Sequence, residues 1–207
     1  EYDNNHNSCI WGYMWGYDWN SAEKGDNISK PKTDADFTPL GLMNYSEVCF
    51  LKAEAALRGW QGAGDAKTNY ENGIRASFEE MRANAPKDSY SKSNDDKYIS
   101  EGNVAWNNAD SFEAKLEKII TQKWIGIYPN SEEAWAEFRR TGYPKLNPVK
   151  QSLEPTINPK NGEFIKKLRY VDNELSNNKE YATDPTLNGG QGDGLSVRVW
   201  WDTARYK

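Results

Sequence analysis

The chain has 207 residues, enough for one well-packed hydrophobic core or for two small ones. Its 31 acidic and 26 basic residues are mixed along the sequence and give a net charge of −5, which argues against a nucleic-acid-binding protein, because that class needs a basic patch. No apolar run approaches the roughly 20 residues of a membrane-spanning helix. Nine Trp and twelve Tyr stand beside a hydrophobic fraction of 37%, and such aromatic content suits surfaces that bind carbohydrate or another protein.

Residues 1–42 show no helical period and are predicted to form a loop with one short strand. Within them every odd position of one stretch is aromatic: Trp11, Tyr13, Trp15, Tyr17 and Trp19. Because side chains alternate between the two faces of an extended backbone, these five rings would lie on one face. Two interpretations are open. The rings form a platform on which sugars stack, or they pack against the helices that follow.

Four later segments carry apolar residues at the three- and four-residue spacing of a helix that buries one face. These segments are residues 46–60, 65–84, 111–128 and 131–141. The first two are predicted to form an antiparallel pair, and residues 43–142 as a whole are predicted to form two such pairs.

Local signals mark several helix ends. Asp65 can cap the second helix, and Asp110 and Glu113 have the spacing of a capping box at the start of the third. Gly142 and Pro144 end the fourth.

The apolar stripes of the third and fourth helices include Trp124 and Trp135, which we therefore expect to be largely buried. Between the two helix pairs, residues 86–109 are polar and are predicted to be a loop. After residue 144 the helical period is lost. Asn161 and Gly162 form a hairpin-turn signal, residues 189–194 are a glycine-rich loop, and residues 197–201 are predicted to be a short strand.

Residues that carry chemistry are scarce. His6 is the single histidine, so neither a zinc site nor a histidine-dependent nucleophile is expected. Cys49 lies in an apolar helical stretch and is predicted to be a buried free thiol, while a disulfide with Cys9 has no support. There is no phosphate-binding loop and no dinucleotide fingerprint. We therefore expect no catalytic residue, no metal site and no cofactor, although a pair of carboxylates for glycoside hydrolysis stays open among the 31 acids.

Five stretches of the chain form an ordered set of motifs. Residues 44–56 contain the pattern Y-x-E-V-x-x-x-x-A-E-A, and the other stretches are residues 120–124, 133–144, 168–170 and 200–202. Each stretch is short, but the ordered set is specific. It resembles the SusD/RagB family over about residues 43–202.

This resemblance implies a mainly α fold of tetratricopeptide-like antiparallel helix pairs, with long irregular loops and a few short strands. We expect residues 1–207 to form a single domain, the C-terminal part of a SusD-like fold. Within it, residues 1–42 would be the aromatic loop region, 43–142 the helix pairs and 143–207 an irregular tail. The resemblance also implies that full-length members are longer and begin with a lipidated cysteine, so we expect residues 1–207 to correspond to the C-terminal part only.

The resemblance also implies a function. The protein would be a lipid-anchored outer-membrane protein on the cell surface, where it would bind oligosaccharide for nutrient uptake together with a SusC-like, TonB-dependent transporter. It would bind no nucleic acid and would not be an enzyme. In the family, the stretch ahead of the first of these helices often supplies aromatic residues that face the ligand, and this favours the aromatic residues from Trp11 to Trp19 as ligand-binding residues.

Two other functions remain open. A helical-repeat scaffold would bind a segment of a partner protein in a groove between its helices. A glycoside hydrolase, the less favoured of the two, would need two carboxyl groups roughly 5–10 Å apart in a cleft.

Overall fold

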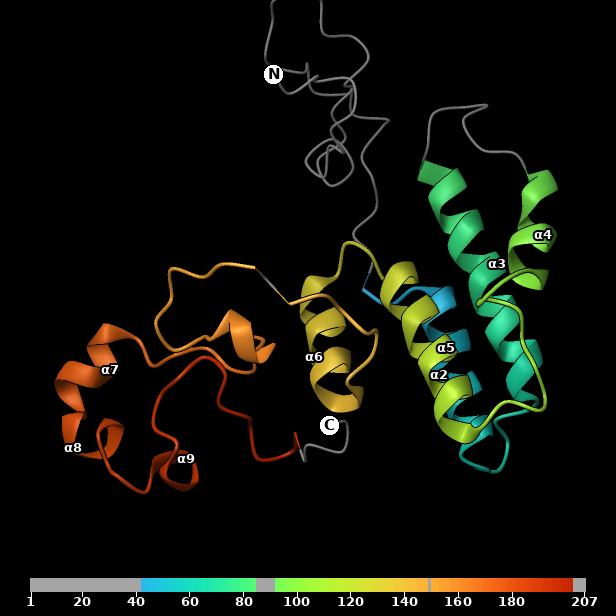
Figure 1. Cartoon of the computed structure of the whole chain (residues 1–207). Coiled ribbons are helices and arrows are strands. Elements are labelled where there is room, and N and C mark those ends of the chain that lie inside the picture. Colours follow the sequence, from blue (N-terminus) through green and yellow to red (C-terminus); the bar gives the residue numbers. More distant parts are fainter. Residues whose placement is uncertain (1–41, 85–91, 149, 203–207) are drawn as a thin grey trace, which may run out of the picture. The chain divides into compact units, whose positions relative to one another are not determined.

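The computed structural model describes residues 42–84, 92–148 and 150–202 (Figure 1). The chain divides into two compact units, residues 1–130 and residues 131–207, and each is described by itself. Every regular element in the described ranges is a helix, so the mainly α fold class is confirmed. The single domain that we expect over residues 1–207 stays a prediction.

The first unit contains four α-helices and a short 3₁₀-helix among its described residues (Figure 1). They are α2 (Tyr45–Leu57), α3 (Ala66–Asn84), η4 (Lys92–Asn94), α4 (Asp95–Ser100) and α5 (Phe112–Gly126). Helices α2, α3 and α5 correspond to the first three predicted helices within a few residues at each end. The second unit begins with α6 (Ser131–Thr141), which is the fourth.

Helices α2 and α3 form the predicted antiparallel pair. Ser46, in the first turn of α2, donates hydrogen bonds from its backbone nitrogen and its hydroxyl to the carboxylate of Glu80, near the end of α3, at 3.0 and 2.7 Å. The turn between the helices begins at Gly59, whose φ of +76° is a left-handed conformation that glycine adopts without strain. The backbone nitrogens of Gly59 and Trp60 donate to the carbonyls of Ala56 and Ala55, which closes the end of α2.

Phe50 lies where α2, α3 and α5 meet. Its side chain is 1% exposed, and its ring packs edge-on against Tyr70 with 6.4 Å between ring centroids. The backbones of the neighbouring helices come close to this ring at two glycines. A Cβ atom added to Gly73 of α3 would be 2.7 Å from the ring, and one added to Gly126 of α5 would be 3.2 Å from it. The ring therefore fills a space that only glycine leaves free.

Helix α5 packs against α2, and contacts at their opposite ends show that it runs antiparallel to α2. At one end Lys123 forms an ion pair with Glu47 at 3.7 Å between Nζ and Oε1, and at the other Arg58 lies over the ring of Phe112. The Lys123 side chain is 1% exposed, so the bundle buries a charge and its partner together. Breaking such a pair by removing one partner costs about 3–5 kcal/mol, because a buried charge is left alone.

The buried Lys123 explains why the expectation for Trp124 is wrong. The buried face of α5 carries Leu116, Ile119, Ile120, Lys123 and Ile127. Trp124 follows Lys123 and is turned about 100° further around the helix. Its side chain is therefore 37% exposed. The amphipathic pattern placed the aromatic residue in the core, whereas the ion pair with Glu47 places the lysine there.

Two further predictions about the first unit are corrected. Residues 86–109 are not only loop, because they contain α4, which is held to α3 by an ion pair of 2.6 Å between Arg82 and Asp95. The cap of α5 is Ser111, whose hydroxyl accepts a hydrogen bond from the backbone nitrogen of Ala114. Asp110 does not cap the helix; it forms an ion pair with Lys118. The predicted cap at Asp65 is confirmed by a 2.8 Å hydrogen bond from the Thr68 backbone nitrogen.

The second unit consists of α6, four short helices and irregular segments among its described residues. The short helices are η5 (Pro159–Asn161), α7 (Asp172–Asn177), α8 (Lys179–Ala182) and α9 (Leu187–Gly190). The expected short strands are wrong for residues 150–202. Gly162 follows η5 with a φ of +68° and starts no hairpin, and Val197 and Asp202 donate to the carbonyls of Gly194 and Val199, which are turn bonds. The glycine-rich stretch of residues 189–194 begins in the last turn of α9.

Side chains of α6 and backbone atoms of the loops hold the second unit together. Gly142, with a φ of +79°, ends α6 where the sequence predicted. The Lys166 backbone nitrogen donates to the carbonyl of Leu195 at 2.7 Å, and the Leu195 nitrogen donates to the hydroxyl of Thr156 at 3.1 Å. Three segments distant in sequence thus pack without a sheet. No helix in the described part of the chain is both long and apolar enough to cross a membrane.

The variant Gly73→Ala tests the packing of Phe50. The added methyl group would lie 2.7 Å from Phe50 Cε1, so the ring or the helices must shift. Alanine in place of glycine inside a helix otherwise stabilises by about 1 kcal/mol, so the sign of the change separates the two effects. We expect a loss of about 1–3 kcal/mol in the free energy of unfolding, measured by urea denaturation.

Gly126→Ala is the matched control for this variant. Its Cβ atom would be 3.2 Å from Phe50 and 3.3 Å from Ser77, which small movements relieve, so the loss should be smaller. Adding Phe50→Leu to Gly73→Ala should recover part of the lost stability. A Gly73→Ala protein at least as stable as the wild type would show that Phe50 does not limit the approach of the helices.

Candidate functional site

The five aromatic residues predicted to bind ligand, Trp11, Tyr13, Trp15, Tyr17 and Trp19, lie outside the described residues. Cys9 and His6 lie outside them as well. Their assignment as ligand-binding residues stays a prediction. The site that the structure does describe is a cavity in the second unit.

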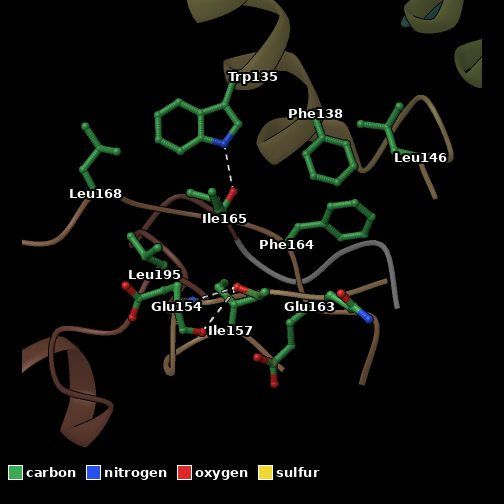
Figure 2. Close-up of a pocket in the computed structure, with 12 residues that line it drawn as sticks. Trp135, Phe138, Leu146, Glu154, Ile157, Glu163, Phe164, Ile165, Leu168 and Leu195 are labelled. Atoms are coloured by element: carbon green, nitrogen blue, oxygen red, sulfur yellow. Dashed lines mark hydrogen bonds between the residues drawn. The ribbon is translucent and has the colours of Figure 1, made fainter. Parts of the chain in front are cut away.

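This cavity has a volume of about 520 Å³ and lies between α6 and the irregular segments (Figure 2). Such a volume is within the range of small-molecule sites in proteins. The lining is mostly aliphatic and aromatic: Trp135, Phe138, Leu146, Ile157, Phe164, Ile165, Leu168 and Leu195. Gln151, Ser152, Glu154 and Glu163 are the polar residues of the lining.

Helix α6 contributes Trp135 and Phe138, which share one face because they are three residues apart. The Trp135 indole nitrogen donates a 2.8 Å hydrogen bond to the carbonyl of Ile165 (Figure 2). Phe138 packs edge-on against Phe164 with 5.0 Å between ring centroids. These two contacts attach residues 164–165 to the helix. Trp135 is half-buried and so less buried than its apolar stripe predicted.

The guanidinium of Arg139 stacks on two indole rings. It lies 3.7 Å from the ring centroid of Trp135 and 4.9 Å from that of Trp201. Arg139 also donates a 3.2 Å hydrogen bond to the carbonyl of Lys166. A planar cation between aromatic rings is a favourable contact, and burial lowers the pKa of this Arg139 side chain. Trp201 is therefore a packing residue, not a strand residue as predicted.

The carboxylates beside the cavity are engaged in structural hydrogen bonds. Glu154 accepts from the hydroxyl and the backbone nitrogen of Thr156 at 2.7 and 3.1 Å, and these bonds lower the pKa of Glu154. Glu163 accepts from the backbone nitrogen of Asn158 at 2.7 Å. A general acid of a glycosidase needs a raised pKa. Glu154 has the opposite shift, so this cavity does not favour glycoside hydrolysis.

The described residues contain no group of three or more His, Cys, Asp and Glu that could hold a metal ion. Asp193, in the glycine-rich loop, forms an ion pair with Lys167 and accepts a 2.9 Å hydrogen bond from the backbone nitrogen of Tyr170. These contacts fix the loop to residues 167–170. The prediction of a buried free thiol at Cys49 is confirmed.

Several aromatic side chains of both units are open to solvent. Trp200 is 92% exposed, Trp60 67% and Tyr181 56%. Such rings can stack on the apolar face of a sugar. The sequence predicts no ligand-binding role for Trp200, which lies in the predicted strand of residues 197–201 and in the last of the five motifs. The cavity was also missed, since it is made by segments that are distant in sequence and show no periodic pattern.

Residues 3–202 match the family model of the SusD-like proteins, described as "Susd and RagB outer membrane lipoprotein". The chain belongs to this family. The match covers nearly the whole chain and confirms the resemblance seen in the five motifs. It also agrees with the helical fold, since α2, α5 and α6 are the helices that carry the first three of those motifs.

Solved structures of SusD-like proteins resemble the chain in sequence and in fold. A chitin-binding SusD homologue from Flavobacterium johnsoniae is 35% identical over 82% of this chain and 40% of that chain, with a TM-score of 0.63. A SusD homologue from Bacteroides uniformis is 32% identical over 85% of this chain and 39% of that chain, with a TM-score of 0.63. A SusD homologue from Bacteroides vulgatus is 33% identical over 90% of this chain and 42% of that chain, with a TM-score of 0.60. The chain therefore spans about two fifths of the length of these relatives. No curated protein matches it.

Two tryptophans of this SusD-like chain test the account of the second unit. Trp135→Ala removes the stacking on Arg139 and the hydrogen bond to Ile165, and it enlarges the cavity. We expect a loss of about 3 kcal/mol in the free energy of unfolding, the low end for Trp→Ala because the ring is only half-buried. Trp200→Ala is the matched control and should leave stability within about 0.5 kcal/mol. Both variants are measured by thermal unfolding. Equal losses of stability in the two would contradict the assignment of Trp135 to the packing of the second unit.

Proposed function

We propose that this chain is part of a cell-surface protein that binds oligosaccharide for nutrient uptake. The observation that carries the proposal is the match of residues 3–202 to a family described as outer-membrane lipoproteins, together with a relative, 35% identical, that is described as chitin-binding. In this proposal the protein is held at the outer membrane by a lipid anchor and passes its ligand to a SusC-like, TonB-dependent transporter.

The ligand-binding residues that we propose are Trp11, Tyr13, Trp15, Tyr17 and Trp19. Sugars stack on flat rings that stay in contact with water. The five rings stand at alternate positions of the sequence, which places them on one face of an extended backbone. Nearby side chains such as Asp18 and Asn20 offer hydrogen-bonding groups for sugar hydroxyls. The cavity of the second unit suits a sugar less well, because its lining is mostly aliphatic and aromatic.

We also propose that the protein binds its ligand without hydrolysing it. Glu154 and Glu163, the carboxylates that line the cavity, are engaged in hydrogen bonds within the protein, and the pKa of Glu154 is lowered. Neither carboxyl group is therefore suited to act as the general acid. The relatives support this proposal, because the Flavobacterium johnsoniae homologue is described as chitin-binding.

A protein-interaction scaffold is the second candidate function. The feature that favours it is the apolar cavity, whose lining includes the exposed side chains of Leu168 and Ile165 at 72% and 47% exposure. The scaffold would recognise apolar side chains of a partner segment instead of a sugar. We rank it second because the match to the SusD-like family covers nearly the whole chain.

The proposal is tested by titration calorimetry of residues 1–207 with chitotetraose. We expect weak binding, because an open stacking surface leaves much of the ligand hydrated. Trp15→Ala and Trp19→Ala should each reduce the affinity about threefold to tenfold, equivalent to about 1 kcal/mol for a lost ring contact.

Trp60→Ala is the matched control for this titration, because its ring is 67% exposed but lies in the turn after α2. It should leave the affinity unchanged. The chitotetraose recovered after the titration should keep its length in mass spectrometry. Absence of binding, or an affinity that is the same in the wild type and both variants, would refute the assignment of the rings. Shortened sugar would refute the proposal of binding without hydrolysis.

A further inference from the structure

Three cationic side chains of the second unit converge on one carboxylate, that of Asp202. Arg198 forms an ion pair with Asp202 at 2.5 Å, and Lys166 lies 3.6 Å from the other carboxylate oxygen. Arg139 interacts with the same carboxylate by charge and donates a hydrogen bond to the backbone carbonyl of Lys166. The cluster joins α6, the loop after η5 and the C-terminal end of the described residues.

The charges of this cluster do not balance. Within residues 131–148 and 150–202, Lys166 and Arg198 both form their ion pair with the same acidic side chain, that of Asp202. Among these described residues Lys166 and Arg198 share one carboxylate, and the charge of Arg139 adds to theirs, which leaves an excess of two positive charges. Neighbouring cations of the second unit are matched instead, as for Arg169, which lies within 4.0 Å of both Glu154 and Asp193.

The excess charge is held where water screens it poorly. The side chains of Lys166 and Asp202 are 12% and 4% exposed. Burial lowers the pKa of Lys166, and the nearby Arg198 and Arg139 lower it further, although Asp202 opposes them. The Arg139 Nε atom and the Asp202 Oδ2 atom are both buried, and neither makes a hydrogen bond to any described residue. Electrostatic attraction for an anion is stronger in such surroundings than on an open surface.

The cluster is accessible on the side of Arg198. Arg198 has 38% of its side chain exposed, and Trp200, two residues further on, is 92% exposed. A guanidinium binds carboxylate, sulfate or phosphate through paired hydrogen bonds, and an exposed indole two residues away in the sequence offers a face for a sugar ring. These are the two elements that recognition of an acidic sugar requires.

We propose that Arg139, Lys166 and Arg198 form an anion-binding site that takes the carboxylate or sulfate group of an acidic sugar, with Trp200 as the stacking surface beside it. Asp202 is a positioning residue that orients Arg198 and Lys166. This inference rests on the proposed function and narrows its ligand to glycans that contain uronic acid or sulfated units.

The first test uses inorganic sulfate as a probe and does not depend on any glycan. Thermal unfolding of residues 1–207 is followed in increasing sodium sulfate, with sodium chloride at the same ionic strength as the reference. We expect a sulfate-specific rise in the melting temperature of the wild type, since a ligand that binds the folded state stabilises it. In Arg198→Gln and Lys166→Gln this rise, measured from each variant's own melting temperature, should fall by at least about half.

Arg169→Gln is the matched control, because this arginine belongs to the same unit and is 47% exposed but lies beside two carboxylates. It should keep the sulfate-specific rise of the wild type. The same rise in all four proteins, or none in the wild type, would overturn the anion site.

The second test is titration calorimetry with three ligands: an oligogalacturonate, a sulfated chondroitin oligosaccharide and neutral chitotetraose. We expect at least one acidic ligand to bind about tenfold more tightly than chitotetraose and to lose that advantage in Arg198→Gln and in Trp200→Ala. Equal affinities for acidic and neutral ligands would overturn this inference but leave the proposed function standing. Failure of all three ligands to bind would overturn both the acidic-sugar site and the proposed function. A failure of the sulfate test alone would overturn the anion site only.

Discussion

The three-helix packing of the first unit depends on the ring of Phe50. Glycine at residues 73 and 126 lets α3 and α5 approach this ring, and Tyr70 packs against its edge. A core packed this closely leaves no room for one methyl group more, so the helix positions follow from the shape of the ring and the missing Cβ atoms. The ion pair of Lys123 with Glu47 and the hydrogen bonds of Ser46 to Glu80 then fix the helices along their lengths.

The second unit is stabilised differently. It has one helix of three turns, and its remaining segments are held by side chains that reach backbone carbonyls, as Trp135 and Arg139 do. Segments of this kind leave space between them, which here is the apolar cavity, and they bring distant charges together, as around Asp202. Binding features on loops fixed to a rigid helical scaffold are a common arrangement in proteins.

The helices could be predicted because their signals are local: apolar residues at helical spacing, Asp65 as a cap and Gly142 as a stop. The predictions that were wrong concern contacts between distant residues. Helix α4 is polar in sequence and depends on Arg82 of α3, and the place of Trp124 in the core is taken by Lys123 because Glu47 faces it. Nothing periodic marks the segments that build the cavity, so no local pattern could have located it. The aromatic residues from Trp11 to Trp19 stay a prediction.

The central claim, that a SusD-like chain binds oligosaccharide on the aromatic rings ahead of its first family helix, is tested most directly by a crystal structure of residues 1–207 grown with chitotetraose. We expect sugar rings stacked on at least two of the five side chains Trp11, Tyr13, Trp15, Tyr17 and Trp19, with the cavity beside Trp135 free of sugar. Sugar in that cavity, or five aromatic rings packed into the protein interior with no sugar against them, would contradict it.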